Sequence, residues 1–135
     1  MANKKLLSCN IDELKEKIIR FYYSDGGYFS GYKSINIIKS ITEIKYTYSH
    51  SLKGNKKEYV FSNEKWDEFI NRLFKENIQN WKNKYYDNNI CDGEQWELEM
   101  EFQDLPKFKS FGSNEYPNNW EIFQKIIHEY FPKMK

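Results

Sequence analysis

Carboxylates recur at every second position along one short stretch of the chain. Between positions 92 and 104 there are six acidic residues and no basic residue: Asp92, Glu94, Glu97, Glu99, Glu101 and Asp104. In an extended strand the three central glutamates share one face, about 7 Å apart. Such a ladder could dock a basic partner or weakly bind a divalent cation. The alternative is an ordinary solvated face, partly neutralised by a residue such as Lys45 on a neighbouring strand.

Soft metal ligands are few and scattered along the sequence. They are Cys9, His50, Cys91 and His128, which lack CxxC or HxxxH spacing and fall in different expected elements. The stretch 87–93 resembles a calcium loop, but its glycine comes one place late and the terminal glutamate is missing. We therefore predict no metal site and no cofactor.

Signatures of catalysis are absent from the sequence. No GxSxG elbow frames a serine, and Gly26, Gly27 and Gly31 lack the spacing of a phosphate-binding loop. His128 follows an apolar pair and is interpreted as a residue at a helix C-terminus, where the helix dipole favours it. We assign no catalytic residue, which counts against an enzyme without deciding the question.

Tyrosines could form a second kind of site. A pocket for a small ligand or a nucleotide could be lined by four of them: Tyr28, Tyr32, Tyr46 and Tyr116. The rings that we expect to be exposed overlap with this set: Tyr22, Tyr28, Tyr32 and Tyr86. Trp81 and Tyr85 are interleaved with lysines and could stack on bases, but we assign both to the apolar stripe of a helix.

The acidic ladder implies a strand that positions it. Alternate residues between the glutamates are apolar: Trp96, Leu98, Met100 and Phe102. This period of two predicts a strand with one buried and one solvated face. A turn at 104–106 leads to a second short strand at 107–111, and a helix is expected to begin at Pro117–Asn118, with Asn118 and Glu121 in capping-box register.

The remaining chain supplies elements to cover this hairpin. Asn10 and Glu13 have capping-box spacing and predict a short first helix or turn, followed by a strand at 18–23. Two strands are expected between 32 and 50 with a break at 39–40, and a further strand at 58–61. A helix capped at Ser62 or Asn63 carries an apolar stripe that extends from Trp66 to Tyr85, with a bend near 76–77. The prediction is one α+β domain over residues 1–135, an antiparallel sheet of about 5–6 strands with two main helices packed on one face.

Composition limits the classes of partner. The 135 residues carry a net charge of +1, which argues against nucleic acid as a partner, although 19% of them are aromatic. No apolar stretch is long enough for a signal-peptide core or a membrane span, so we expect a cytoplasmic protein without a membrane partner. Two cysteines predict no disulfide framework.

Three motifs in the C-terminal half suggest a family. The spacings Trp81-x3-Tyr85, Asp92-Gly93-x2-Trp96-x-Leu98 and Gly112-Ser113-Asn114-x-Tyr116-Pro117 resemble an uncharacterised family of small bacterial, Firmicutes-type proteins. The resemblance implies no activity, cofactor or substrate. We interpret the motif residues as structural: a turn at 92–93, a core anchor at 96, unusual backbone angles at 112 and 114, and a helix start at 117. Alternatively, free backbone N–H groups between Gly112 and Tyr116 could hold an anion or a partner's carboxylate.

The leading hypothesis is a small, non-catalytic protein-interaction module that binds or inhibits another protein, in the manner of immunity proteins. Its expected partner has a basic surface. The predicted partner-binding residues are Glu97, Glu99, Glu101, Gly112, Ser113, Asn114 and Tyr116. The alternative is a small-ligand or nucleotide-binding domain that uses the tyrosine pocket.

Overall fold

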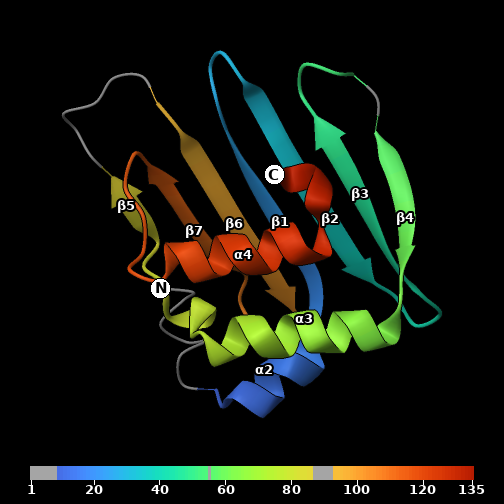
Figure 1. The fold of residues 1–135 in the computed structure, drawn as a ribbon. Coiled ribbons are helices and arrows are strands. Elements are labelled where there is room, and N and C mark those ends of the chain that lie inside the picture. The colour runs from blue at the N-terminus through green and yellow to red at the C-terminus, as the bar shows by residue number, and fades with distance from the viewer. Residues whose placement is uncertain (1–8, 55, 87–92) are drawn as a thin grey trace.

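A computed structural model describes residues 9–54, 56–86 and 93–135. In these residues the chain forms one seven-stranded sheet with helices against it (Figure 1). The strands are β1 (Ile18–Gly27), β2 (Gly31–Lys39), β3 (Ile44–His50), β4 (Lys57–Phe61), β5 (Lys84–Tyr86), β6 (Gln95–Phe102) and β7 (Phe108–Ser113). The helices are α2 (Ile11–Lys17), α3 (Asn63–Lys75) and α4 (Trp120–Tyr130), with two 3-10 turns at Ile78–Asn80 and Pro132–Met134. None of the helices in the described ranges has the length and apolar character needed to span a membrane.

The sheet is mixed. Its strand order is β4-β3-β2-β1-β6-β7-β5, and every neighbouring pair is antiparallel except β5 and β7, which run parallel. The α+β class is therefore confirmed, whereas the expected 5–6 antiparallel strands and two main helices differ from the seven strands and three helices described. The additional strand is β5, which the sequence placed in a helix.

The helix after Ser62 is shorter than its apolar stripe. Ser62 caps α3 as predicted, since its Oγ accepts a hydrogen bond from the Lys65 N–H at 3.1 Å. The helix ends at Lys75 because Asn77 adopts a left-handed backbone with φ of 58°. Tyr85 therefore lies on β5 rather than on the helix, and the prediction of one stripe reaching Tyr85 was wrong.

The N-termini of α2 and α4 were also predicted from capping residues, and only the first prediction is confirmed. Asn10 caps α2 as expected by accepting a hydrogen bond from the Glu13 N–H at 2.7 Å. The last helix begins at Trp120 rather than at Pro117–Asn118. Asn119 makes no capping bond there. Its side chain instead accepts from Trp81 Nε1 at 2.9 Å and donates to the Glu76 carbonyl at 2.6 Å, which joins α4 to the end of α3.

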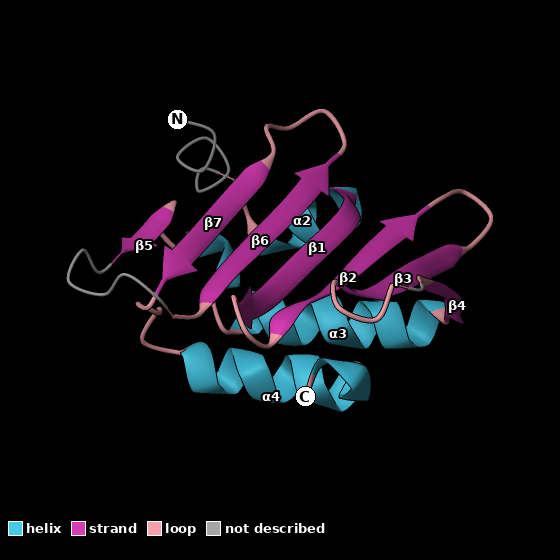
Figure 2. Cartoon of the chain, turned by 90° about the horizontal axis from the view of Figure 1, so that it is seen from above, coloured by secondary structure: helices cyan, strands magenta, loops and turns pink. Residues whose placement is uncertain are grey.

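The helices cover one face of the sheet. The apolar residues of β6 are all buried on that face, as the alternation predicted: Trp96, Leu98, Met100 and Phe102. Phe69 of α3 is fully buried among aromatic rings from β1, β4 and the end of α4. In the described part of the chain, α3 and α4 lie on the same side, and the opposite face of the sheet carries no helix (Figure 2).

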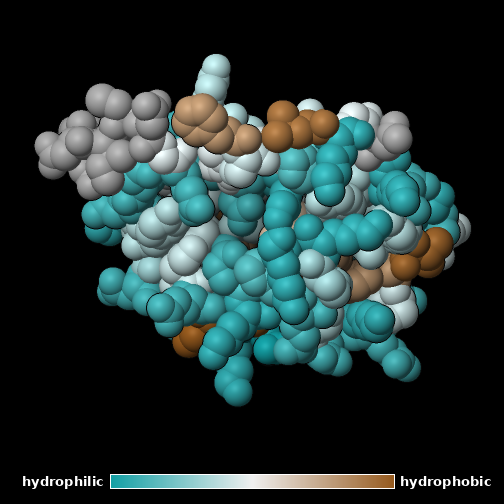
Figure 3. Space-filling view, turned by 45° about the horizontal axis from the view of Figure 1, so that its top comes forward, coloured by the Kyte–Doolittle hydropathy of each residue, from teal (hydrophilic) through white to brown (hydrophobic). Residues whose placement is uncertain are grey.

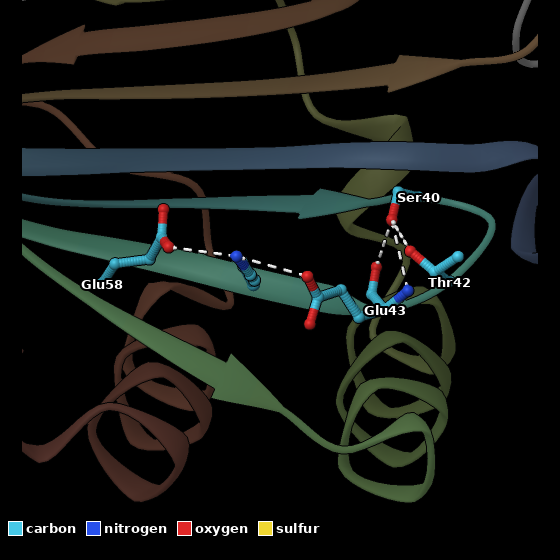
Figure 4. A network of polar contacts seen from close by, with 5 residues as sticks. Ser40, Thr42, Glu43 and Glu58 are labelled. Carbon is cyan, nitrogen blue, oxygen red and sulfur yellow. Dashed lines mark hydrogen bonds and ion pairs between the residues drawn. The ribbon is translucent and has the colours of Figure 1, made fainter.

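Ion pairs lie on the face of the sheet that carries no helix, which we call the open face, near its β4 edge. Lys45 on β3 lies between Glu43 and Glu58, at 3.2 and 3.3 Å from their carboxylates, beside the turn in which Ser40 hydrogen-bonds to Glu43 (Figure 4). The sequence suggested that Lys45 would neutralise the glutamate ladder of β6. Lys45 instead pairs with Glu43 and Glu58, so this suggestion was wrong.

Candidate functional site

A groove of about 900 Å³ opens on the face of the sheet that α3 and α4 leave uncovered. Of the residues that the structure describes, thirteen from β1, β2, β3, β5, β6, β7 and the turn after β3 line it: Tyr22, Ser24, Tyr32, Ser34, Ser49, Ser51, Tyr86, Gln95, Trp96, Glu97, Phe111, Gly112 and Ser113. Eight of the thirteen are serine or tyrosine. The groove is therefore polar at its floor and aromatic at its sides.

A row of small hydroxyl side chains forms the floor. Ser24 pairs with Ser34 across β1 and β2, and Ser34 pairs with Ser49 across β2 and β3. The same row continues in the other direction, because Ser24 pairs with Glu97 and Glu97 with Phe111. Among the residues that the structure describes, none of the three serine hydroxyls has a side-chain hydrogen-bond partner. They are available to a bound molecule.

Tyrosines flank the row on both sides. Tyr22 precedes Ser24 by two positions, and Tyr32 precedes Ser34 by two, so each lies on the same face as its serine. Because β1 and β2 are antiparallel, the two tyrosines lie on opposite sides of the serine row. Tyr86 and Phe111, which are 59% and 41% exposed, close the end formed by β5 and β7.

The glutamate ladder is mostly neutralised within the protein. Glu101 pairs with Arg20 at 2.7 Å, and Glu99 pairs with Lys107 at 2.8 Å. Glu97 is exposed and forms no ion pair with any described residue. Of the three predicted glutamates, only Glu97 lines the groove.

The predicted loop at 112–116 begins with the last two residues of β7 and leads toward α4, and it contacts Glu94, the residue before β6. Asn114 has a φ of 58°, as expected, and its side-chain oxygen accepts a hydrogen bond from the Glu94 N–H at 3.1 Å. Its own N–H donates to the Glu94 carbonyl. The Tyr116 ring packs against Trp120 in a tilted arrangement, with the ring centroids 4.9 Å apart, and its hydroxyl donates to the Glu94 carboxylate at 3.2 Å. These contacts hold the loop in place, while Gly112 and Ser113 line the groove. Asp92, the first residue of the proposed turn, lies outside the described residues.

The tyrosines of the alternative pocket are not brought together. Tyr32 lines the groove, but Tyr46 lies on the helix side of the sheet, against Phe61 and Phe131. Tyr28 is 82% exposed at the turn between β1 and β2.

That turn carries an exposed hydrophobic cluster beside the groove. Tyr28 packs edge-on against Phe29, which is 88% exposed. Leu52, in the turn after β3, is 65% exposed and lies so close to Gly31 that a Cβ on this glycine would come within 2.6 Å of Leu52 Cγ. Hydrophobic groups are visible at the upper edge of the molecule in Figure 3. Contiguous exposed apolar surface is a feature of sites that contact other molecules, and we treat these side chains as a candidate contact surface.

A second polar cluster lies on the helix side of the sheet. Gln124 of α4 donates a hydrogen bond to the Tyr23 hydroxyl at 2.7 Å, and Tyr23 donates to Asp25 at 2.6 Å. His128 and Lys33 line the same small cavity of about 250 Å³. Burial raises the pKa of Asp25, and burial lowers the pKa of His128. His128 occupies the last turn of α4 as predicted. The hydrogen-bond chain links α4 to β1.

The raised pKa of Asp25 gives a pH-dependent prediction. The folded protein holds the Asp25 proton more tightly than the unfolded chain does, because burial disfavours the carboxylate. The contribution of protonated Asp25 to the free energy of unfolding is therefore fully present at pH values below the pKa of Asp25 in the unfolded chain. It is lost as the pH rises through the higher pKa of Asp25 in the folded protein. Asp25→Asn, whose amide oxygen can still accept from Tyr23, is expected to raise the melting temperature more at pH 7 than at pH 4. Thermal melts at both values, with exposed Asp12→Asn as control, check this; an equal shift at both would contradict it.

The serine row is the part of the site that the sequence analysis missed. Ser24, Ser34 and Ser49 lie on three strands, and only their register makes them neighbours. Tyr22 and Tyr86 were expected as exposed rings, and both line the groove. The sequence did contain one indication of this site. Side chains alternate between the two faces of a strand, which places Ser24 on the same face as Tyr22, and Ser34 on the same face as Tyr32.

Comparison of the chain with protein-family models, with curated proteins and with solved structures finds no match. The resemblance to a family of small bacterial proteins stays a prediction.

Proposed function

We propose that this protein is a small, non-catalytic module that binds another protein through the groove on the open face of its sheet. The observation that carries the proposal is the composition of the groove, in which eight of thirteen lining residues are serine or tyrosine. Tyrosine offers a large, rigid and amphipathic contact area at low entropic cost, and serine offers adaptable hydrogen bonds. The same two residue types dominate the binding loops of antibodies.

Two further observations support a protein partner. Exposed apolar side chains adjoin the groove, because the Tyr28–Phe29 ring pair and Leu52 lie in the two turns that also carry the groove residues Tyr32 and Ser51 at their ends. Large exposed rings are typical anchors of protein interfaces. Glu97 has no ion-pair partner among the described residues, and its negative charge favours a partner with a basic group.

The alternative, a small-ligand pocket lined by tyrosines, has less support. It requires Tyr46 and Tyr32 in one cavity, whereas Tyr46 packs against Phe131 on the helix side of the sheet.

Blocking the groove tests the proposal. Ser34→Trp places a bulky side chain in the middle of the floor, and tryptophan is well tolerated in strands. The tagged protein is used to capture partners from native host lysate treated with nuclease. We expect one protein in stoichiometric amount with the wild type, and its loss with Ser34→Trp.

The matched control is Gln103→Trp, an equally bulky change at an exposed turn at the other end of β6. It should leave capture intact. The proposal fails if Ser34→Trp retains the same protein, if nuclease abolishes capture, or if folded wild-type protein captures nothing.

A further inference from the structure

The shape of the groove indicates what part of a partner would enter it. The row from Phe111 through Glu97, Ser24 and Ser34 to Ser49 crosses five strands, from β7 to β3. Neighbouring strands lie about 4.8 Å apart, so this row is about 19 Å long. An extended polypeptide advances about 3.3 Å per residue, and the row therefore accommodates about six residues.

The floor chemistry matches a polypeptide backbone. A serine hydroxyl can both donate and accept a hydrogen bond, so the row at Ser24, Ser34 and Ser49 can meet N–H and carbonyl groups alike. Tyr22 and Tyr32 border the row on opposite sides and would contact side chains that project from an extended segment. The groove thus offers hydrogen bonds along its axis and aromatic surface along its margins.

The charge of the groove determines a position within that segment. Glu97 lies in the row between Ser24 and Phe111, and it has no ion-pair partner among the described residues. Glu99 and Glu101 are paired with Lys107 and Arg20. The nearby Lys84 is positioned over the Phe111 ring, 5.9 Å from the ring centroid, and forms no ion pair with Glu97. A lysine or arginine of a bound segment could form an ion pair with Glu97, which none of the described residues does, and its aliphatic stem would lie against the adjacent rings.

We propose that the groove binds an extended segment of a partner protein, about six residues long, that places a lysine or arginine side chain against Glu97. This inference rests on the proposed function and specifies the partner's chemistry. Glu97 would bind the basic side chain of the partner, whereas Glu99 and Glu101 form ion pairs within the protein.

The test uses phage-displayed random dodecapeptides selected on the immobilised wild-type protein, with Ser34→Trp protein as the counter-selection. We expect the selected peptides to share a lysine or arginine. The strongest peptide is then synthesised with a fluorophore, and its binding is measured by anisotropy to the wild type, Glu97→Gln and Glu101→Gln. Glu97→Gln should weaken binding about tenfold, as for loss of a charged hydrogen bond, and Glu101→Gln should leave it unchanged.

Higher salt should weaken binding to the wild type more than binding to Glu97→Gln. The inference is overturned if no peptide distinguishes the wild type from Ser34→Trp, if the selected peptides lack a shared basic residue, or if Glu97→Gln binds like the wild type. Matching melting temperatures establish that both glutamine variants are folded. If Ser34→Trp abolishes capture of a cellular protein while Glu97→Gln does not, only this inference fails and the proposed function stands.

Discussion

Phe69→Ala is expected to lower the free energy of unfolding by about 3–5 kcal/mol, the usual cost of deleting a buried phenylalanine ring. Phe69 is fully buried in α3. Its ring centroid lies 5.1 Å from that of Phe21 on β1 and 5.4 Å from that of Phe131 beyond α4. Removing it leaves a cavity where the sheet and both covering helices meet. Denaturant unfolding followed by tryptophan fluorescence measures the loss.

Two variants serve as controls for Phe69→Ala. Phe69→Leu retains most of the buried volume and should cost less. Phe29→Ala removes the same side chain from a position that is 88% exposed, and it should change stability little. A loss below about 1 kcal/mol for Phe69→Ala would contradict the assigned core, since measured costs for such deletions are well above this value.

Gly112→Ala is expected to destabilise the fold by about 1–3 kcal/mol, as overpacking of a filled site does. A Cβ at this position would lie 2.1 Å from Trp96 Nε1 and 2.6 Å from the Glu115 carbonyl. These two atoms are hydrogen-bonded to each other at 3.0 Å, and Trp96 is almost completely buried. The added methyl must therefore displace the tryptophan or the loop.

The neighbouring Ser113→Ala, on the open face, is the matched control and should be nearly neutral. Equilibrium unfolding compares the two variants, and the total tryptophan emission of the folded protein should also change in Gly112→Ala, because Trp96 packs against Trp81 and Trp120. A Gly112→Ala protein as stable as the wild type would show that the loop yields easily. The expected reason for this glycine was an unusual backbone angle, but Gly112 is not among the glycines with positive φ. Close approach of Trp96 is the reason instead.

The sequence predicted elements well where a single period ran uninterrupted. The alternation from Trp96 to Phe102 predicted β6 and its buried face, and the break at 39–40 separated β2 from β3. The prediction failed after Lys75, where the apolar residues continue at helical spacing although the helix does not. One left-handed residue, Asn77, redirects the chain, and Tyr85 reaches the core from a strand. The bend expected near 76–77 lies at this residue, but hydrophobic spacing did not show that the helix ends there.

The site was predictable only in part, for a related reason. Alternation along one strand shows that Glu97 and Ser24 face away from the core, and this can be read without a structure. It does not show that Ser24, Ser34 and Ser49 stand opposite one another, because pairing register depends on all the turns between them. Nor does it show that Arg20 and Lys107 neutralise Glu101 and Glu99. Contacts across strand pairs, one between β1 and the distant β6 and one within the β6–β7 hairpin, decide which charges remain available.

The central position of β1 in the sheet has a consequence for how the chain folds. One neighbour, β2, follows β1 after a short turn. The other neighbour is β6, which is distant in the sequence, so that Tyr22 of β1 pairs with Glu99 of β6. During synthesis the first four strands are complete before β6 emerges from the ribosome, and one long side of β1 has no partner until then. Unpaired strand edges recruit strands of other chains. Until β6 is available, this edge of β1 is therefore open to pairing with the strands of another copy of the chain.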